Sequence, residues 1–108
     1  MSRAILTHKV NGCNDAVSVQ VLDDPGVGLA CHKYRLDLPG SGFEPVTIDF
    51  QNGPIIECGA NGLTHEALLA VVIDRLQSFQ KGPFACRENA LALTKIEEAM
   101  HWLHHRTM

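Results

Sequence analysis

The period of the hydrophobic pattern changes once along this chain of 108 residues, at a glycine-containing break over residues 59–62. Before the break, apolar and polar residues alternate over short stretches, as in half-buried β-strands. After the break, apolar residues recur every three or four positions, as on one face of a helix. The sequence therefore predicts an α+β chain, with an antiparallel sheet of about five strands followed by a two-helix hairpin.

Turn-forming segments separate the predicted strands. Asn11-Gly12 can supply a hairpin turn, Pro25-Gly26 ends the second strand, and residues 39–42 form a glycine-containing loop. Because the connections are short, the strands are expected to be antiparallel. The predicted strands are residues 4–10, 16–22, 29–38, 46–50 and 55–58.

The two predicted helices have clear ends. Thr64 can cap the first helix, Lys81-Gly82-Pro83 ends it, and the second runs from about Cys86 to the end of the sequence. The apolar stripes comprise Leu68, Leu69, Val72, Ile73, Leu76 and Phe79 on the first helix, and Leu93, Ile96, Met100 and Leu103 on the second. Leu91 and Trp102 fall outside the second stripe, so a second apolar surface is expected to meet a partner.

We expect one domain over residues 1–108, with the sheet in 1–58 and the hairpin in 63–107. Hydrophobic residues make up 45% of the chain, which is enough for a packed core. The formal charge of −3 disfavours a strongly basic DNA-binding protein. No apolar run approaches the roughly 18 residues that would span a bilayer, and the N-terminus lacks the apolar centre of a secretory signal. An intracellular protein without DNA or membrane partners is expected.

Cysteine and histidine spacing gives little support for a metal site. No CxxC pair exists, so the cysteines are predicted to be reduced and mostly buried. They are Cys13, Cys31, Cys58 and Cys86. His101 and His105 would share a helix face, as metal ligands can, but no neighbouring Cys or Asp completes a ligand set. We therefore predict neither a metal nor a cofactor.

The sequence contains no recognisable catalytic motif of the hydrolase, phosphate-loop or dinucleotide-binding kind. Asp23-Asp24 precedes Pro25-Gly26 and is interpreted as turn chemistry with solvated charge. Cys86 stands near a helix start, where a thiolate is stabilised, but a structural role is favoured. Without a nucleophile and a base, no catalytic residue is predicted, and the chain is not expected to be an enzyme.

The two ends of the predicted hairpin carry residue types that suit a nucleotide. Phe79 ends the first helix, Phe84, Arg87 and Asn89 open the second, and Arg106 lies near its end. An aromatic ring can stack on a base, an amide can read a base or ribose edge, and arginine can pair with phosphate. Taken singly, these residues have ordinary explanations as core, helix-start and solvated side chains.

Long stretches of the sequence resemble one family. They are residues 28–35, 50–54, 61–70, 74–76 and 79–103. The sequence resembles the phage Thoeris anti-defense proteins of the first type, whose helical hairpin is shared with phage anti-CBASS cyclic-nucleotide sponges. The resemblance covers about residues 28–107 and is densest in the hairpin. The family hairpin commonly continues into a basic, glycine-containing tail, whereas this sequence ends at Met108.

The resemblance implies a function. Such proteins bind cyclic nucleotide immune signals in the cytoplasm of the infected bacterial host and hold them without cleavage. The implied ligand is glycocyclic ADP-ribose, and some members are hexamers (trimers of dimers) that also bind cyclic di- or trinucleotides. Carried onto this sequence, Phe79 would stack on adenine, Asn89 would hydrogen-bond the ligand, and Arg106 would contact it from the end of the second helix.

The separation of these residues adds a geometric expectation. Asn89 and Arg106 are 17 positions apart, or about 25 Å along a helix at about 1.5 Å per residue. A single nucleotide-sized ligand does not span that distance. We therefore predict that Arg106 comes from a second subunit, which gives a symmetric dimer two equal pockets. Three alternatives remain open: a hexameric sponge mainly for cyclic di- or trinucleotides, a metal-assisted hydrolase using His101 and His105, and a protein whose hairpin only assembles oligomers.

Overall fold

The computed structural model describes residues 2–107 and divides the chain into two compact units. The first unit extends to Leu63 and contains the sheet, and the second begins at Thr64 and contains the helical hairpin. Each unit is described by itself below.

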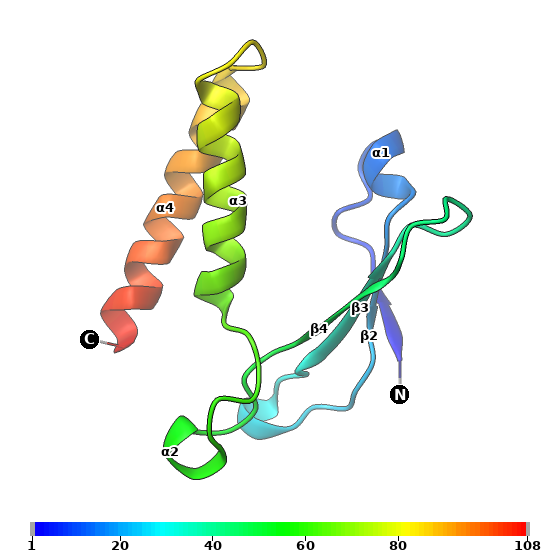
Figure 1. Cartoon of the computed structure of the whole chain (residues 1–108), viewed down its shortest axis with the longest axis vertical. Helices are drawn as coiled ribbons and strands as arrows, with labels where there is room; N and C mark the ends of the chain where they lie inside the picture. Colours follow the sequence, from blue (N-terminus) through cyan, green and yellow to red (C-terminus); the bar gives the residue numbers. More distant parts are fainter. Residues whose placement is uncertain (1, 108) are drawn as a thin grey trace. The chain divides into compact units, whose positions relative to one another are not determined.

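The sheet is a meander of four antiparallel strands (Figure 1). The strands are β1 (Arg3–Ile5), β2 (Ser18–Val21), β3 (Lys33–Asp37) and β4 (Val46–Asp49), in that order across the sheet. Val21 on β2 pairs with Arg3 on one side and Tyr34 on the other. Among residues 2–106, Val21 alone is fully removed from water. The predicted α+β class and antiparallel sheet are confirmed.

The prediction of a fifth strand at residues 55–58 is wrong. These residues form one helical turn, α2 (Ile55–Cys58), because the Cys58 and Gly59 amides donate to the carbonyls of Pro54 and Ile55, each at 2.8 Å. The surrounding loop is closed by side-chain amides. Gln51 donates to the Gly53 and Gly59 carbonyls at 3.1 and 2.8 Å. Asn61 exchanges two hydrogen bonds of 2.8 Å with the backbone of Asn52. The loop also returns to the sheet through a parallel bridge between Phe50 and Leu63.

All four observed strands are shorter than predicted, and the difference is largest for β1 and β3. β1 ends at Ile5, and the chain then turns into α1 (Gly12–Asp15), whose first turn is capped by the side chain of Asn11. β3 begins only at Lys33. Before it, residues Val27–Leu29 form a short 3₁₀ turn, η1, in which Leu29 takes a positive φ of 62° that is incompatible with a strand.

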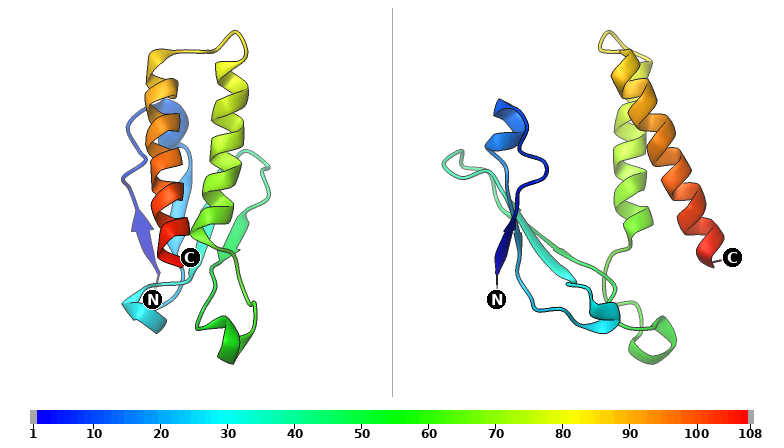
Figure 2. Two further views of the ribbon diagram at one scale, coloured as in Figure 1. Left: turned by 90° about the vertical axis from the view of Figure 1, so that its left-hand side faces the viewer. Right: turned by 180° about the vertical axis from the view of Figure 1, so that it is seen from behind.

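The second unit is an antiparallel pair of helices, α3 (His65–Gln80) and α4 (Arg87–Thr107), which lie side by side (Figure 2). Thr64 caps α3 as predicted, since its hydroxyl accepts a hydrogen bond of 3.1 Å from the Ala67 amide. The predicted stripes lie half-buried between the helices, apart from Val72, which is 42% exposed. No helix within the described residues is long and apolar enough to cross a membrane.

Much apolar surface remains uncovered in the single chain. Val71, Leu91 and Trp102 are at least half exposed, so the second apolar surface expected on the hairpin is present. The prediction that the cysteines are mostly buried is wrong for the single chain. All four are free thiols, and three are exposed: Cys13, Cys58 and Cys86.

Candidate functional site

The turn between α3 and α4 gathers aromatic and cationic side chains. The rings of Phe79 and Phe84 meet edge to face, with centroids 6.2 Å apart and planes at 85°. Arg75, one helical turn before Phe79, places its guanidinium carbon 4.9 Å from the centre of the Phe79 ring. This distance is within the range of a cation–π contact. Phe79 is half-buried and Phe84 is 71% exposed, so one ring is anchored while the other faces solvent.

Gln80 and Cys86 fasten the turn. The Gln80 side-chain amide accepts a hydrogen bond from the Cys86 amide at 3.1 Å and donates to the Cys86 carbonyl at 3.2 Å. The Cys86 thiol in turn accepts a hydrogen bond from the Asn89 amide at 3.4 Å. Through these hydrogen bonds Cys86 caps the start of α4, which is a structural role of the kind that the sequence favours for it. It fixes the first turn of α4, which carries Arg87 and Asn89.

The local charge suits an anion. Between Arg75 and Asn89 the charged residues are Arg75, Lys81, Arg87 and Glu88, so this segment carries two net positive charges in a chain of net charge −3. The N-terminus of α4 lies in the same segment and adds the partial positive charge of the helix dipole. An aromatic ring beside such a cationic turn can hold a base together with its phosphates.

Arg106 lies at the opposite end of the hairpin. Its guanidinium is 4.0 Å from the Glu66 carboxylate, in the first turn of α3. Glu66 and Phe79 are 13 residues apart, or about 20 Å along the helix. The structure therefore brings Phe79, Phe84, Arg87 and Asn89 to one turn within a chain, and it does not bring Arg106 there.

The histidine face of α4 has a defined geometry. The rings of His101 and His105 are parallel within 2°, with centroids 6.4 Å apart, and both rings contact Trp102 edge to face. Within the described part of the chain, no group of three His, Cys, Asp or Glu side chains could hold a metal ion.

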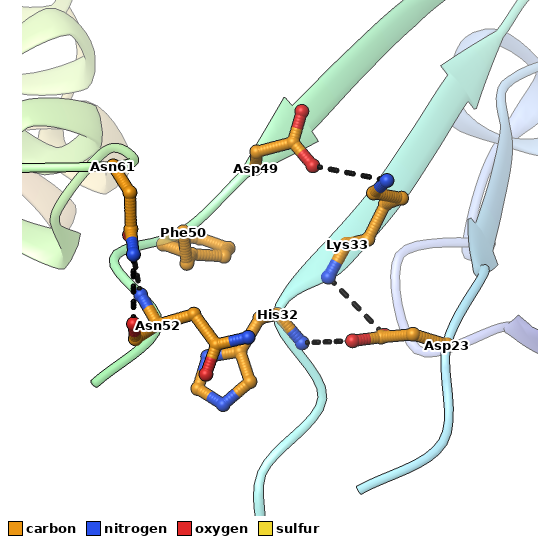
Figure 3. Close-up of a pocket in the computed structure, with 7 residues that line it drawn as sticks. All are labelled: Asp23, His32, Lys33, Asp49, Phe50, Asn52 and Asn61. Atoms are coloured by element: carbon orange, nitrogen blue, oxygen red, sulfur yellow. Dashed lines mark hydrogen bonds and ion pairs between the residues drawn. The ribbon is translucent and has the colours of Figure 1, made fainter. Parts of the chain in front are cut away.

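A hollow lies in the first unit, beside the start of β3 and the end of β4 (Figure 3). It has a volume of about 320 Å³. Its lining residues are Asp23, His32, Lys33, Asp49, Phe50, Asn52 and Asn61. The sequence did not predict it, because it joins loop residues that are far apart along the chain.

Internal contacts occupy the charged groups of this hollow. The Asp23 carboxylate accepts hydrogen bonds from the His32 and Lys33 amides at 2.9 and 3.2 Å. The bond from the His32 amide is the main reason that the pKa of Asp23 lies below its ordinary value of 3.8. Lys33 pairs with Asp49 at 3.6 Å. Asp23 therefore holds the start of β3 in place, whereas the sequence suggested only turn chemistry with solvated charge at this residue. Because its charged groups already have partners, the hollow is a weaker candidate for a ligand site than the turn between α3 and α4.

Sequence reasoning did not single out Arg75. The signal that could have found it is its position four residues before Phe79, which places both side chains on one helix face.

Comparison with known proteins places the hairpin in a family. Residues 44–108 match the sequence model of the Acb2/Tad1 hairpin domain. The chain is also 59% identical over 61 residues to a Bacillus phage SBSphiJ7 protein named "Thoeris anti-defense 1". That match covers 56% of this chain and 43% of the relative, so the chain matches less than half of the relative's length. The chain belongs to the Acb2/Tad1 hairpin-domain family.

Proposed function

We propose that this chain is a phage anti-defense sponge that binds a cyclic nucleotide immune signal at the hairpin turn and holds it without cleavage. The observation that carries the proposal is the aromatic and cationic turn itself, with Phe79 anchored between Arg75 and Phe84. The name of the Bacillus phage relative supports the biological role. The expected place of action is the cytoplasm of the infected host.

Each residue of the turn has a role in this proposal. Phe79 stacks on adenine, with Phe84 at its edge, and Asn89 hydrogen-bonds the ligand from the first turn of α4. Arg87 supplies positive charge beside it. The proposed ligand is glycocyclic ADP-ribose, whose base suits the ring and whose pyrophosphate suits the cationic segment.

Arg106 joins the site only from a second copy of the chain. Its distance from Phe79 within one chain supports this arrangement. The half-exposed apolar side chains Val71, Leu91 and Trp102 offer surface for the contact between copies. We therefore propose a homo-oligomer, either a dimer or a trimer of dimers, with Arg106 of one chain facing the turn of another.

A capture-and-release assay tests the proposal. The protein is mixed with glycocyclic ADP-ribose and filtered, the retained fraction is denatured, and the ligand is followed by chromatography. A sponge removes the ligand from the filtrate and returns it intact. Ligand returned in altered form would overturn sequestration in favour of hydrolysis. Ligand that stays in the filtrate would overturn this ligand, whereas capture of cyclic di- or trinucleotides in its place would favour the hexameric alternative.

Two variants locate the site. Phe79→Ala removes a base-stacking ring, worth about 1–3 kcal/mol, so affinity is expected to fall roughly 5- to 150-fold. Asn89→Ala is likewise expected to weaken capture, because it removes a hydrogen bond to the ligand. Both variants are expected to keep the oligomeric mass of the unaltered protein in sedimentation. Phe43→Ala is the matched control, because Phe43 is half exposed and lies in the sheet unit. Full capture by Phe79→Ala and Asn89→Ala would place the site elsewhere.

A further inference from the structure

The guanidinium of Arg75 lies against the ring of Phe79 and has no carboxylate partner among the described residues. It lies 4.9 Å from the centre of the Phe79 ring, and no ion pair of the described residues includes it. A cation–π contact fixes the position of a guanidinium but leaves its N–H groups able to donate. Arg75 is therefore a positioned cation whose donors are available to an anion.

The position of Arg75 relative to a stacked base suggests what that anion is. In a cyclic nucleotide, a phosphate is joined to the base through one ribose. A base stacked on Phe79 thus brings a phosphate into the neighbourhood of the Arg75 side chain. A guanidinium suits this task better than an ammonium group, because its planar set of donors matches two phosphate oxygens at once.

We propose that Arg75 is a ligand-binding residue that pairs with a phosphate of the nucleotide whose base stacks on Phe79. This inference rests on the proposed function and adds a contact from α3 to those from α4. It also predicts a selectivity: the site prefers phosphate-bearing ligands over uncharged nucleosides of the same base.

Arg87 and Lys81 are the other cations at this turn, and they are exposed, as Arg75 is. Within the described part of the chain, neither contacts an aromatic ring, whereas Arg75 is already oriented against Phe79. An oriented side chain loses less rotamer entropy when it binds, so Arg75 is expected to contribute more affinity than either neighbour.

The test compares Arg75→Ala with the unaltered protein, using glycocyclic ADP-ribose as the probe and calorimetry at several salt concentrations. Loss of a charge-assisted hydrogen bond is expected to weaken binding about 10- to 100-fold. The dependence of affinity on salt should also become shallower, since one phosphate pairing has been removed. Arg75→Lys keeps the charge and should bind with intermediate affinity and a salt dependence near that of the unaltered protein.

Lys95→Ala is the matched control. It removes one positive charge from an exposed position on α4, where Lys95 pairs with Glu98 at 3.7 Å. Its affinity and salt dependence should be unchanged. Alanine is a strong helix former, and unchanged far-ultraviolet circular dichroism would show that both variants keep their helices.

The outcomes separate the two proposals. If the unaltered protein binds and Arg75→Ala binds equally well, Arg75 has no role and the sponge function stands. If Arg75→Ala loses affinity with an unchanged salt dependence, the residue acts only by orienting Phe79, and the phosphate contact is refuted. If the unaltered protein does not bind the probe, the proposed ligand fails and this inference falls with it.

Discussion

Gly62 controls how closely the α2 loop approaches the sheet. A Cβ atom at this position would lie 2.5 Å from the Phe50 carbonyl oxygen and 2.7 Å from that of Asp49. These atoms belong to the backbone and cannot swing aside as a side chain could. In Gly62→Ala, the loop is therefore expected to move away from the end of β4.

The cost of this movement can be worked from two hydrogen bonds of the bridge. The Gln51 amide donates to the Leu63 carbonyl at 2.8 Å, and the Leu63 amide donates to the Asp49 carbonyl at 2.7 Å. Each such bond contributes about 0.5–1.5 kcal/mol, so losing both costs about 1–3 kcal/mol. A chain that kept both bonds would instead absorb a steric overlap of similar cost.

Amide hydrogen exchange measures the loss of these two hydrogen bonds directly at the Gln51 and Leu63 amides. In Gly62→Ala, exchange at Gln51 and Leu63 should quicken about 5- to 150-fold, and urea unfolding should show a lower free energy of unfolding. Gly12→Ala is the matched control, because no atom lies within 4 Å of the added Cβ and the φ angle is not left-handed. Unchanged exchange at Leu63 in Gly62→Ala would refute the close-approach argument.

Two further predictions concern a helix cap and a carboxylate. Thr64→Ala removes the hydroxyl that accepts a hydrogen bond from the Ala67 amide, and thermal melts should show a free energy of unfolding lower by about 1 kcal/mol. Thr94→Ala, in the middle of α4, is the control and should not destabilise the protein in the same melts. Because the His32 amide lowers the folded-state pKa of Asp23, its carboxylate stabilises the fold above pH 3.8, and this contribution disappears as pH falls through the lowered pKa. The stability advantage of the unaltered protein over Asp23→Asn, measured by urea unfolding, should therefore be full at pH 7 and shrink below pH 3.8; an advantage that does not change with pH would contradict it.

The hairpin was predictable because its signals are local. The Thr64 cap, the period of the stripes and the Lys81-Gly82-Pro83 stop all act within a turn or two of the chain. They placed the helix boundaries within about a residue of those observed. The grouping of Phe79, Phe84 and Asn89 follows from the same local geometry, since these residues flank one turn.

The errors arose where distant residues decide the local structure. Residues 55–58 have the composition of a strand, yet Gln51 and Asn61 close the loop around them and leave room only for a helical turn. The late start of β3 depends on a hydrogen bond from its first amide, that of Lys33, to Asp23, ten positions earlier. An apolar run alone does not reveal such contacts. The exposed cysteines have the same origin, because burial depends on what packs over a residue.

The small interior of the single chain has a consequence for how such a protein works. Within residues 2–106 only Val21 is sealed from water, so a chain in isolation has few contacts to offset the entropy lost on folding. If a second copy covers the uncovered apolar side chains, folding and association form one linked equilibrium that depends on the total number of chains present. When copies are few, most chains would then be unassembled. Under the proposed function, the capacity to bind a signal would rise more steeply than in proportion to synthesis.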